Sequence, residues 1–512
     1  MESASIPVPA KSVLPEGSGA GEKGLKSGAI GFVSGVVIGV ASTAPGYSLA
    51  SALGLVVVAV GFQAPVIMIA AFVPMLLCAS AYYWMNRADP DCGTTFSWVT
   101  RAMGPSSGWI AGWAIIVADV IVMANLAQIA GLYTFLLFGI KNPSTLAVTI
   151  LGIIFIMAMT YICVIGIELN AKTQIGLLAA ELITLTLFAV VALIRVYAGD
   201  APKTSVDPSL SWFNPANIGS SGAFVSGLLV AIFIYWGWDT TVTVNEETED
   251  PGEAPGRAAI WATVILVAIY VIVSVAAISF AGPGLLANDQ SGDVLGLLAN
   301  KVFGSSTLGK IVIIAVLSSA AASCQTTILP TARTTLSMAR AKALPKRLGD
   351  VDERYLTPAF ATWVMGILSV AWYVGLTIVS TNILNDAIAA LGLWIAFYYG
   401  LTAFACTIYY RRHVFDNVKN FIFLGLAPML GGLMLLGILI KSIHDLAKPA
   451  NSASGESWFG IGPPLVIGIG FMIIGAILMV VWRLRGNDEF FGRKLEVADP
   501  ALVAHSHAGS EA

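Results

Sequence analysis

Charged residues are scarce in this chain: Asp, Glu, Lys and Arg make up 11% of its 512 residues, whereas hydrophobic residues make up 57%. A soluble domain carries roughly a quarter charged residues. The chain therefore has too few charges to cover a globular surface of its size, and we expect the lipid bilayer to cover much of it. The net charge of -3 gives no signal for nucleic acid or another polyanion as a partner.

Histidine and cysteine, which supply most metal sites, are scarce as well. The four histidines fall in loops, at the ends of apolar stretches or in the tail, and the five cysteines are scattered like small hydrophobic residues rather than a disulfide framework. No HExxH motif, no CxxC pair and no GxxxxGKS/T motif occurs. These absences argue against a membrane-embedded enzyme and an ATP-driven pump, and we expect no metal and no cofactor.

Long apolar stretches dominate what is present. About 20 apolar residues cross roughly 30 Å of hydrocarbon, and twelve stretches meet this need. They lie near residues 28–59, 64–86, 107–138, 145–166, 173–198, 220–246, 257–281, 307–338, 358–380, 384–410, 418–442 and 460–483. The sequence thus predicts an all-α integral membrane protein with one transmembrane domain.

The predicted domain covers residues 28–483, with a core at 28–410 and two further helices at 418–483. A polar N-terminal segment at 1–27, expected to be disordered, precedes it, and a tail at 484–512 follows. Most of the 27 Lys and Arg fall on the side of the termini if the spans are even in number. The positive-inside rule then predicts that both termini are cytoplasmic and that the chain crosses the plasma membrane several times.

The first apolar stretch is too long for one straight helix and contains ASTAPGYS at 41–48. A plain turn there would leave a first helix of about 14 residues, roughly 21 Å long, which is shorter than the hydrocarbon core. Pro45 cannot donate a helical hydrogen bond, so we expect a break near the middle of the helix. Irregular backbone in a membrane lines a cavity or packs against protein. On this stretch alone, a kinked helix whose hydroxyl side chains satisfy the free carbonyls is an equal alternative.

A second interruption lies in the stretch at 220–246, where Trp236, Gly237, Trp238 and Asp239 follow one another. A carboxylate at this depth costs about 3 kcal/mol in lipid, so Asp239 should face a polar interior. The tetrapeptide FVSG precedes each interruption, and the two stretches are five spans apart. Paired broken helices in corresponding halves of a chain are typical of an inverted-repeat transporter whose site lies between the repeats.

Four patches of sequence together resemble the amino acid–polyamine–organocation (APC) superfamily of permeases. GWDTTVTVNEETEDP at 237–251 is similar to the family signature of glycine, aromatic and acid with its later EE and NP pairs. DPDCGTTFSWVTRAMGPSSGWIAGW at 89–113 resembles the loop that leads into the third span, and TARTTLSMARAKALPKRLGDVDERYLTP at 331–358 resembles the end of the eighth. GVVIGVASTAP at 35–45 occupies the place of the family's break in helix 1.

The resemblance implies a LeuT-like core, a 5+5 inverted repeat with discontinuous helices 1 and 6, and two peripheral helices. It implies a secondary active permease for amino acids or related amines that works by alternating access, which we expect to be proton-coupled, with sodium as the alternative ion. A polyamine or cationic amine importer and an amino acid exchanger of the same fold are alternatives. A channel is a rival of another class, but one chain with two unlike broken helices suits a carrier better. The oligomeric state is expected to be a monomer or a homodimer.

By the same resemblance, the substrate should contact the backbone of both breaks and the aromatic side chains beside the second. The residues expected there are Gly39, Val40, Ala41, Ser42, Thr43, Phe233, Tyr235, Trp236, Gly237, Trp238 and Asp239.

Five polar residues within spans are candidates for coupling or gating. Asp239 matches the family's acidic gating position, and its alternative role is to cap the break. Glu181 could load and release a proton, or could simply be hydrogen-bonded between helices. Asp119 suits either a cationic substrate or a helix-packing partner. Ser318 and Ser319 lie where sodium-coupled relatives place hydroxyl ligands, although serine is also common at helix contacts in membranes.

Overall fold

The computed structural model describes residues 23–287, 293–379 and 381–495. Within these residues the protein is helical, and the only β-type pairings are two isolated bridges. Ten helical stretches of the described chain are long and apolar enough to cross a membrane. The first of these, Phe32–Ala88, contains three consecutive helices.

The longer helices correspond to the predicted apolar stretches. They are α1 (Phe32–Ser42), α2 (Pro45–Val60), α3 (Ala64–Ala88), α5 (Pro105–Leu137), α6 (Thr145–Ile165), α7 (Ile167–Tyr197), α8 (Ser221–Phe233), α10 (Ala254–Ala281), α13 (Ser306–Arg340), α14 (Ala359–Val379), α15 (Thr381–Tyr409), α17 (Ala427–Leu446) and α18 (Pro463–Leu484).

Short helices occupy several connections. They are α4 (Thr95–Met103), α9 (Thr240–Thr243), α11 (Pro283–Ala287), α12 (Val294–Phe303), α16 (Val418–Asn420) and α19 (Asp488–Phe491), together with the 3₁₀ turns η1 (Gly61–Gln63), η2 (Leu210–Phe213), η3 (Pro215–Asn217), η4 (Asn245–Glu247), η5 (Lys346–Gly349) and η7 (Pro449–Asn451) and the π-helical turn η6 (Phe421–Leu426).

Helix α7 begins earlier than the apolar pattern predicted, at Ile167 rather than near residue 173. Its first turns are polar in sequence, but Asn170 and Gln174 are fully buried. Gln174 donates to the carbonyl of Ala322 in α13 at 3.0 Å. Hydropathy alone misses these turns because their polar side chains are buried against another helix instead of facing water.

Helix α13 lies at the centre of the bundle and contacts α5, α7, α1, α2 and α9. Helices α5 and α18 are both strongly apolar, yet 83% of the apolar stretch of α5 is buried and only 22% of that of α18. Helix α18 therefore presents an apolar surface that needs lipid or another apolar partner to cover it. Helix α5 is instead covered by the protein itself.

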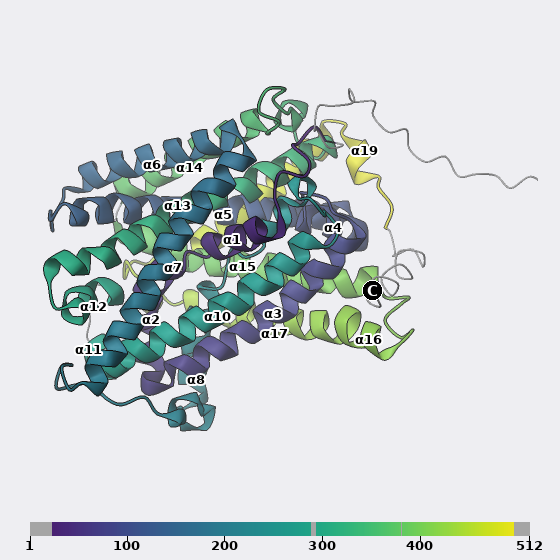
Figure 1. Ribbon diagram of the computed structural model, residues 1–512. Helices are drawn as coiled ribbons and strands as arrows, with labels where there is room; N and C mark the ends of the chain where they lie inside the picture. The colour runs from purple at the N-terminus through teal and green to yellow at the C-terminus, as the bar shows by residue number, and fades with distance from the viewer. Residues whose placement is uncertain (1–22, 288–292, 380, 496–512) are drawn as a thin grey trace, which may run out of the picture.

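Different short helices lie at the two ends of the bundle. Figure 1 shows α11 and α12 at one end and α4, α16 and α19 at the other. Lys23 and Lys494, close to the two described ends of the chain, line one pocket at the second end, which we call the terminal face. Residues 1–22 of the N-terminal segment 1–27, which was expected to be disordered, lie outside the described residues. So do residues 496–512 of the tail at 484–512.

Candidate functional site

The first expected break is present. Helix α1 ends at Ser42 and α2 begins at Pro45, and Ala44 between them adopts a left-handed conformation with φ 48°. Proline at the first position of α2 is favourable because the N–H it lacks has no partner inside a helix. The interruption thus lies at Thr43 and Ala44, inside the stretch ASTAPGYS at 41–48 that was expected to carry it.

Gly39, Val40 and Ala41 lie within the last turns of α1 rather than in irregular backbone. The carbonyl groups near the break are largely occupied. The Thr43 hydroxyl donates to the carbonyl of Val40 at 2.6 Å. Ser323 of α13 donates to the carbonyl of Ser42 at 2.9 Å. Hydroxyl groups therefore satisfy much of the backbone that the break leaves free.

The second expected break is also present and is longer. Helix α8 ends at Phe233 and α9 begins at Thr240, so residues 234–239 connect them without regular helix. Gly237 has φ +118°, a conformation that L side chains rarely adopt. Side chains from other helices again bind the free backbone: Tyr270 donates to the carbonyl of Ile234, and the Gly237 N–H donates to the Tyr399 hydroxyl at 3.3 Å.

The two breaks contact each other directly, although they are far apart in sequence. The hydroxyls of Ser42 and Thr240, 198 residues apart, lie 2.8 Å from each other. A Cβ added at Gly237 would lie 2.8 Å from the carbonyl carbon and oxygen of Ser42, so only glycine fits this approach. In the same way, a Cβ on Gly39 would lie 3.3 Å from the carbonyl oxygen of Trp238. The fold therefore joins the two sequence features into one buried centre.

Helix packing around this centre is crosswise. Helix α1 packs against α9, and α2 packs against α8. The first half of one broken helix thus lies beside the second half of the other. The backbone preceding α1 pairs with the backbone following α9, where the N–H groups of Ala29 and Ile30 donate to the carbonyl of Glu247 at 2.8 and 3.0 Å.

Glu181 of α7 lies at the start of α2. Its Oε1 accepts a hydrogen bond from the N–H of Gly46 at 2.6 Å, while Ser319 Oγ accepts one from the N–H of Tyr47 at 3.2 Å. A carboxylate is favourable at a helix N-terminus because the unpaired N–H groups and the helix dipole are positive there. The side chain of Glu181 is fully buried, and its Oε2 has no hydrogen-bond partner among the described residues.

Asp239 is held by two tyrosines of α15. It accepts hydrogen bonds from Tyr399 at 2.7 Å and from Tyr398 at 3.2 Å. Trp236 Nε1 donates in turn to the Tyr398 hydroxyl at 2.5 Å. The carboxylate, 4% exposed, therefore fixes the irregular segment 234–239 against α15, whichever further role it has.

The remaining candidates are less closely tied to the breaks. Asp119 of α5 accepts a hydrogen bond from Thr331 of α13 at 2.9 Å, which is the helix-packing arrangement. The Ser318 hydroxyl donates to the carbonyl of Ala315 in its own helix. Ser319 does contact the first break, through the N–H of Tyr47, so these two neighbouring serines differ in their contacts.

Aromatic side chains enclose the second break. Trp238 packs against Tyr82 of α3 and Tyr399 of α15, each with ring centroids 5.0 Å away. Tyr235 is fully buried and donates to the carbonyl of Met68 at 3.0 Å. Phe233, at the end of α8, is only partly buried.

Sequence reasoning missed several residues that complete this centre. Ser323, Tyr270, Tyr398 and Tyr399 all bind the breaks or Asp239. Tyr398 and Tyr399 could have been found from their position in the middle of the apolar stretch at 384–410. Tyrosines that anchor a helix at the membrane interface lie at span ends instead.

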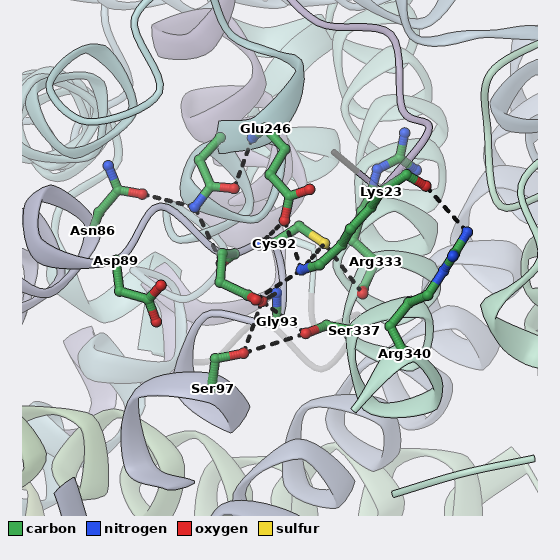
Figure 2. A network of polar contacts seen from close by, with 12 residues as sticks. Lys23, Asn86, Asp89, Cys92, Gly93, Ser97, Glu246, Arg333, Ser337 and Arg340 are labelled. Atoms are coloured by element: carbon green, nitrogen blue, oxygen red, sulfur yellow. Dashed lines mark hydrogen bonds and ion pairs between the residues drawn. The ribbon is translucent and has the colours of Figure 1, made fainter. Parts of the chain in front are cut away.

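A polar network closes the terminal face (Figure 2). Arg333 of α13 and Glu247 form a bidentate ion pair at 2.9 and 3.0 Å, and both side chains are fully buried. Lys23 forms ion pairs at 2.7 Å with Asp91 and with Glu246. These contacts connect the N-terminal segment, the connection between α3 and α4, the end of α9 and α13.

The charges of this network perturb one another. Burial acts to raise the pKa of Asp91, but the Lys23 ammonium and hydrogen bonds from Lys23, Ser337 and Ser97 outweigh it and hold the pKa well below its usual range. Burial likewise acts to lower the pKa of Lys23, but the surrounding thiol and carboxylates hold it above its usual value. Both groups therefore stay charged at neutral pH.

Asp91, Cys92 and Glu246 bring three potential ligand atoms within 4.8 Å of one another. The ammonium of Lys23 lies among them, 2.7 Å from each carboxylate and 3.7 Å from the Cys92 sulfur. The lysine thus supplies the positive charge that a metal ion would bring, and these residues make a lysine-centred ion cluster.

Comparison with known proteins adds to this geometry. A family model described as "Amino acid permease" matches residues 27–481. An uncharacterized transporter of Mycobacterium tuberculosis is 28% identical over 405 residues, which cover 78% of this chain and 80% of that protein. A branched-chain amino acid permease of Lactococcus lactis is 25% identical over 305 residues, covering 57% and 64%. An arginine/ornithine antiporter of Latilactobacillus sakei is 25% identical over 303 residues, covering 56% and 59%.

Proposed function

The chain belongs to the amino acid permease family of the APC superfamily, a family of multi-pass membrane transport proteins, and on that premise we propose that it is a secondary active transporter of amino acids or related amines. It works by alternating access in the plasma membrane, with both termini cytoplasmic. Its twelve spans follow the LeuT-like arrangement, with α1/α2 and α8/α9 as the two discontinuous helices and α17 and α18 as peripheral ones.

One observation carries this proposal: two broken helices meet in one buried centre through Ser42, Thr240 and Gly237. Irregular backbone in a membrane core is tolerated where it is buried in protein or lines a cavity, and transporters place their substrate at such breaks. The centre is closed in this conformation, because every expected site residue except Phe233 is buried. We assign the structure to an occluded step of the cycle.

The substrate class follows from the groups around the breaks. The first-turn N–H groups of α2 are taken by Glu181 and Ser319, and Asp239 is taken by two tyrosines. A substrate would therefore be recognised where it displaces Ser323 from the carbonyl of Ser42 and Tyr399 from the N–H of Gly237, and by the surrounding aromatic rings. An α-amino acid meets both requirements, because its ammonium and carboxylate can bind backbone groups and its side chain can contact the aromatic rings.

Coupling is assigned to Glu181, with the proton as the coupling ion. One carboxylate oxygen is fixed by Gly46 and the other has no hydrogen-bond partner among the described residues. Protonation would remove the negative charge at the start of α2 and so weaken the electrostatic attraction between α7 and the broken helix. A proton on this residue is thereby linked to movement of α2, which is what coupling requires.

Reconstituted vesicles test the proposal. We expect saturable uptake of radiolabelled amino acids, counterflow from preloaded vesicles and accumulation driven by a pH gradient. Glu181→Gln keeps an acceptor for the Gly46 N–H but cannot exchange a proton, so it should lose gradient-driven accumulation and retain counterflow. Glu168→Gln, an exposed acid on the same helix, is the matched control. Ohmic current without saturation would contradict a carrier, and accumulation by Glu181→Gln equal to that of the wild type would contradict its coupling role.

A further inference from the structure

A cavity lies on the terminal face, away from the buried centre of the two breaks. It has a volume of about 220 Å³, far above the roughly 10–15 Å³ that one water needs. Its walls come from five parts of the chain: the N-terminal segment, the connection between α3 and α4, α4 itself, the end of α13 and the segment after α19. Neither the family nor the proposed transport site accounts for it.

The lining is strongly cationic. Five basic side chains and a single acid, Asp91, surround the cavity. The basic residues are Lys23, Arg101, Arg340, Arg493 and Lys494. Lys23 already neutralises the charge of Asp91 in an ion pair, and Asp91 also accepts hydrogen bonds from Ser97 and Ser337 at 2.7 Å each.

Two of the cations have carboxylate partners and three do not. Lys23 binds Asp91 and Glu246, and Arg101 lies 2.9 Å from Asp89. Arg340, Arg493 and Lys494 form no ion pair with any of the residues that the structure describes. Three positive charges without a carboxylate partner therefore face the cavity, and its one carboxylate, Asp91, is already paired with Lys23. The mutual repulsion of these charges favours the binding of an anion between them.

Both arginines are held in place by backbone groups. Arg340 donates to the carbonyl of Lys23 at 3.2 Å, as Figure 2 shows, and Arg493 donates to the carbonyl of Ala341 at 3.3 Å. Each bond uses one of the five N–H groups of a guanidinium. The remaining donors are available with little further loss of side-chain entropy, which favours ligand binding.

The wall formed by the end of the chain is anchored as well. Phe490 of α19 is fully buried and stacks on Phe96 of α4 with ring centroids 5.6 Å apart. Arg493 lies three residues after Phe490, and its guanidinium packs over the Phe490 ring. Lys342 and Glu489 form an ion pair that joins the end of α13 to α19. Arg493 is thus placed by packing.

We propose that this cavity binds a phosphate-bearing anion through Arg340, Arg493 and Lys494. Guanidinium groups bind phosphate oxygens in a bidentate manner, and a lysine adds charge without directional demands. The phosphate belongs either to a soluble phosphorylated compound or to a phospholipid headgroup of the adjacent leaflet. The ligand bridges α13 and the segment after α19, so it stabilises the closed terminal face and slows any cycle that must open it.

Binding is tested with pyrophosphate on the purified full-length protein in phosphatidylcholine nanodiscs, at ionic strength held constant with NaCl. The wild type should show a saturable rise in Tm. The double variant Arg340→Gln/Arg493→Gln should weaken the apparent affinity by about tenfold or more, because each charge-assisted hydrogen bond contributes at least that factor. Arg354→Gln, an exposed arginine between α13 and α14 that does not line the cavity, should behave like the wild type.

A second arm separates the two sources of phosphate. If the ligand is a lipid headgroup, nanodiscs of phosphatidylglycerol raise the Tm of the wild type but not of the double variant, and pyrophosphate has no effect. Equal Tm changes in the wild type and the double variant with both probes, or no change in the wild type with either probe, would overturn the proposal. Size-exclusion chromatography of each variant confirms that it is folded.

The effect on transport rests on the proposed function, whereas binding does not. Pyrophosphate inside wild-type vesicles, or phosphatidylglycerol if the lipid arm is positive, should lower the initial uptake rate, and the double variant should be insensitive. A wild type that binds the probe but transports nothing would refute the proposed function and leave the site standing. Equal inhibition of the wild type and the double variant would refute the regulatory role.

Discussion

At the scale of single residues, several polar groups within the membrane core bind backbone that helices cannot satisfy. Glu181 accepts from the N–H of Gly46, Ser323 donates to the carbonyl of Ser42 and Tyr270 donates to the carbonyl of Ile234. An unpaired buried peptide group costs about 1–3 kcal/mol. These side chains therefore make the breaks stable enough to exist, and an alanine at any of them removes more than its own bond.

Gly237 allows the closest approach in the centre. Alanine there has to adopt φ +118° and place its Cβ 2.8 Å from the Ser42 carbonyl. Gly237→Ala is expected to lose about 1–3 kcal/mol through backbone strain alone, to lower the Tm measured by tryptophan fluorescence, and to abolish uptake. Gly176→Ala on α7, where an added Cβ would meet no atom within 4 Å, should be neutral or slightly stabilising. Normal uptake by Gly237→Ala would show that the breaks need not touch.

At the scale of elements, α13 acts as the support for the first broken helix. Ser319 and Ser323, one turn apart on α13, bind the start of α2 and the end of α1 respectively. The same helix carries Arg333, which holds Glu247 beyond α9. One rigid helix thus fixes both halves of the broken helix and the end of the other, so a movement of α1 must break contacts with α13.

The serines of α13 allow a matched comparison. Ser323→Ala and Ser319→Ala each leave a backbone group of the break without its partner and should cost about 1–3 kcal/mol. Ser318→Ala should cost less than about 0.5 kcal/mol, because its hydroxyl bonds only to its own helix. Thermal unfolding in detergent measures all three. A sodium-dependent rise in Tm that Ser318→Ala abolishes would instead support a sodium site at this serine.

At the scale of the whole molecule, the terminal face is closed by charge and the outer surface is apolar. Lys23 joins the N-terminal segment to residues 91 and 246 through two ion pairs, and Arg333 joins α13 to Glu247. These contacts hold together parts of the chain that no helix connects directly. Their strength sets the free energy needed to open this face.

Removing the Lys23 ammonium should weaken this closure and so lower the Tm, by an amount that depends on pH only at low pH. Lys23 keeps its charge up to and beyond its usual pKa of about 10.4, and Asp91, whose pKa is lowered, stays ionised down to and below its usual value of about 3.9. The Tm difference between the wild type and Lys23→Gln should therefore be constant from about pH 6 to pH 9, and should shrink only as pH falls below about 4, through the folded pKa of Asp91. Lys26→Gln, whose ion pair with Glu168 is more exposed, is the control. A difference that varies strongly near pH 7 would contradict the assignment.

The local sequence predicted each break because each rests on residues with a fixed local preference. Pro45 cannot continue a helix, and Gly237 with its neighbouring carboxylate disfavours a lipid-facing one. The first interruption lies at Thr43 and Ala44, inside the stretch ASTAPGYS at 41–48 and directly before Pro45. The same reasoning did not identify Tyr398 and Tyr399, whose importance comes from facing Asp239 across the bundle.

The sequence by itself determined that this protein is helical, lies in a membrane and interrupts two of its helices, since composition, span length and proline or glycine act locally. Only the tertiary structure decided what those features do together. It brought Ser42 against Thr240, placed Glu181 at the start of α2 and surrounded one cavity with Arg340, Arg493 and Lys494. Contacts between residues far apart in the chain depend on how helices pack, and packing is a property of the whole fold rather than of any one segment.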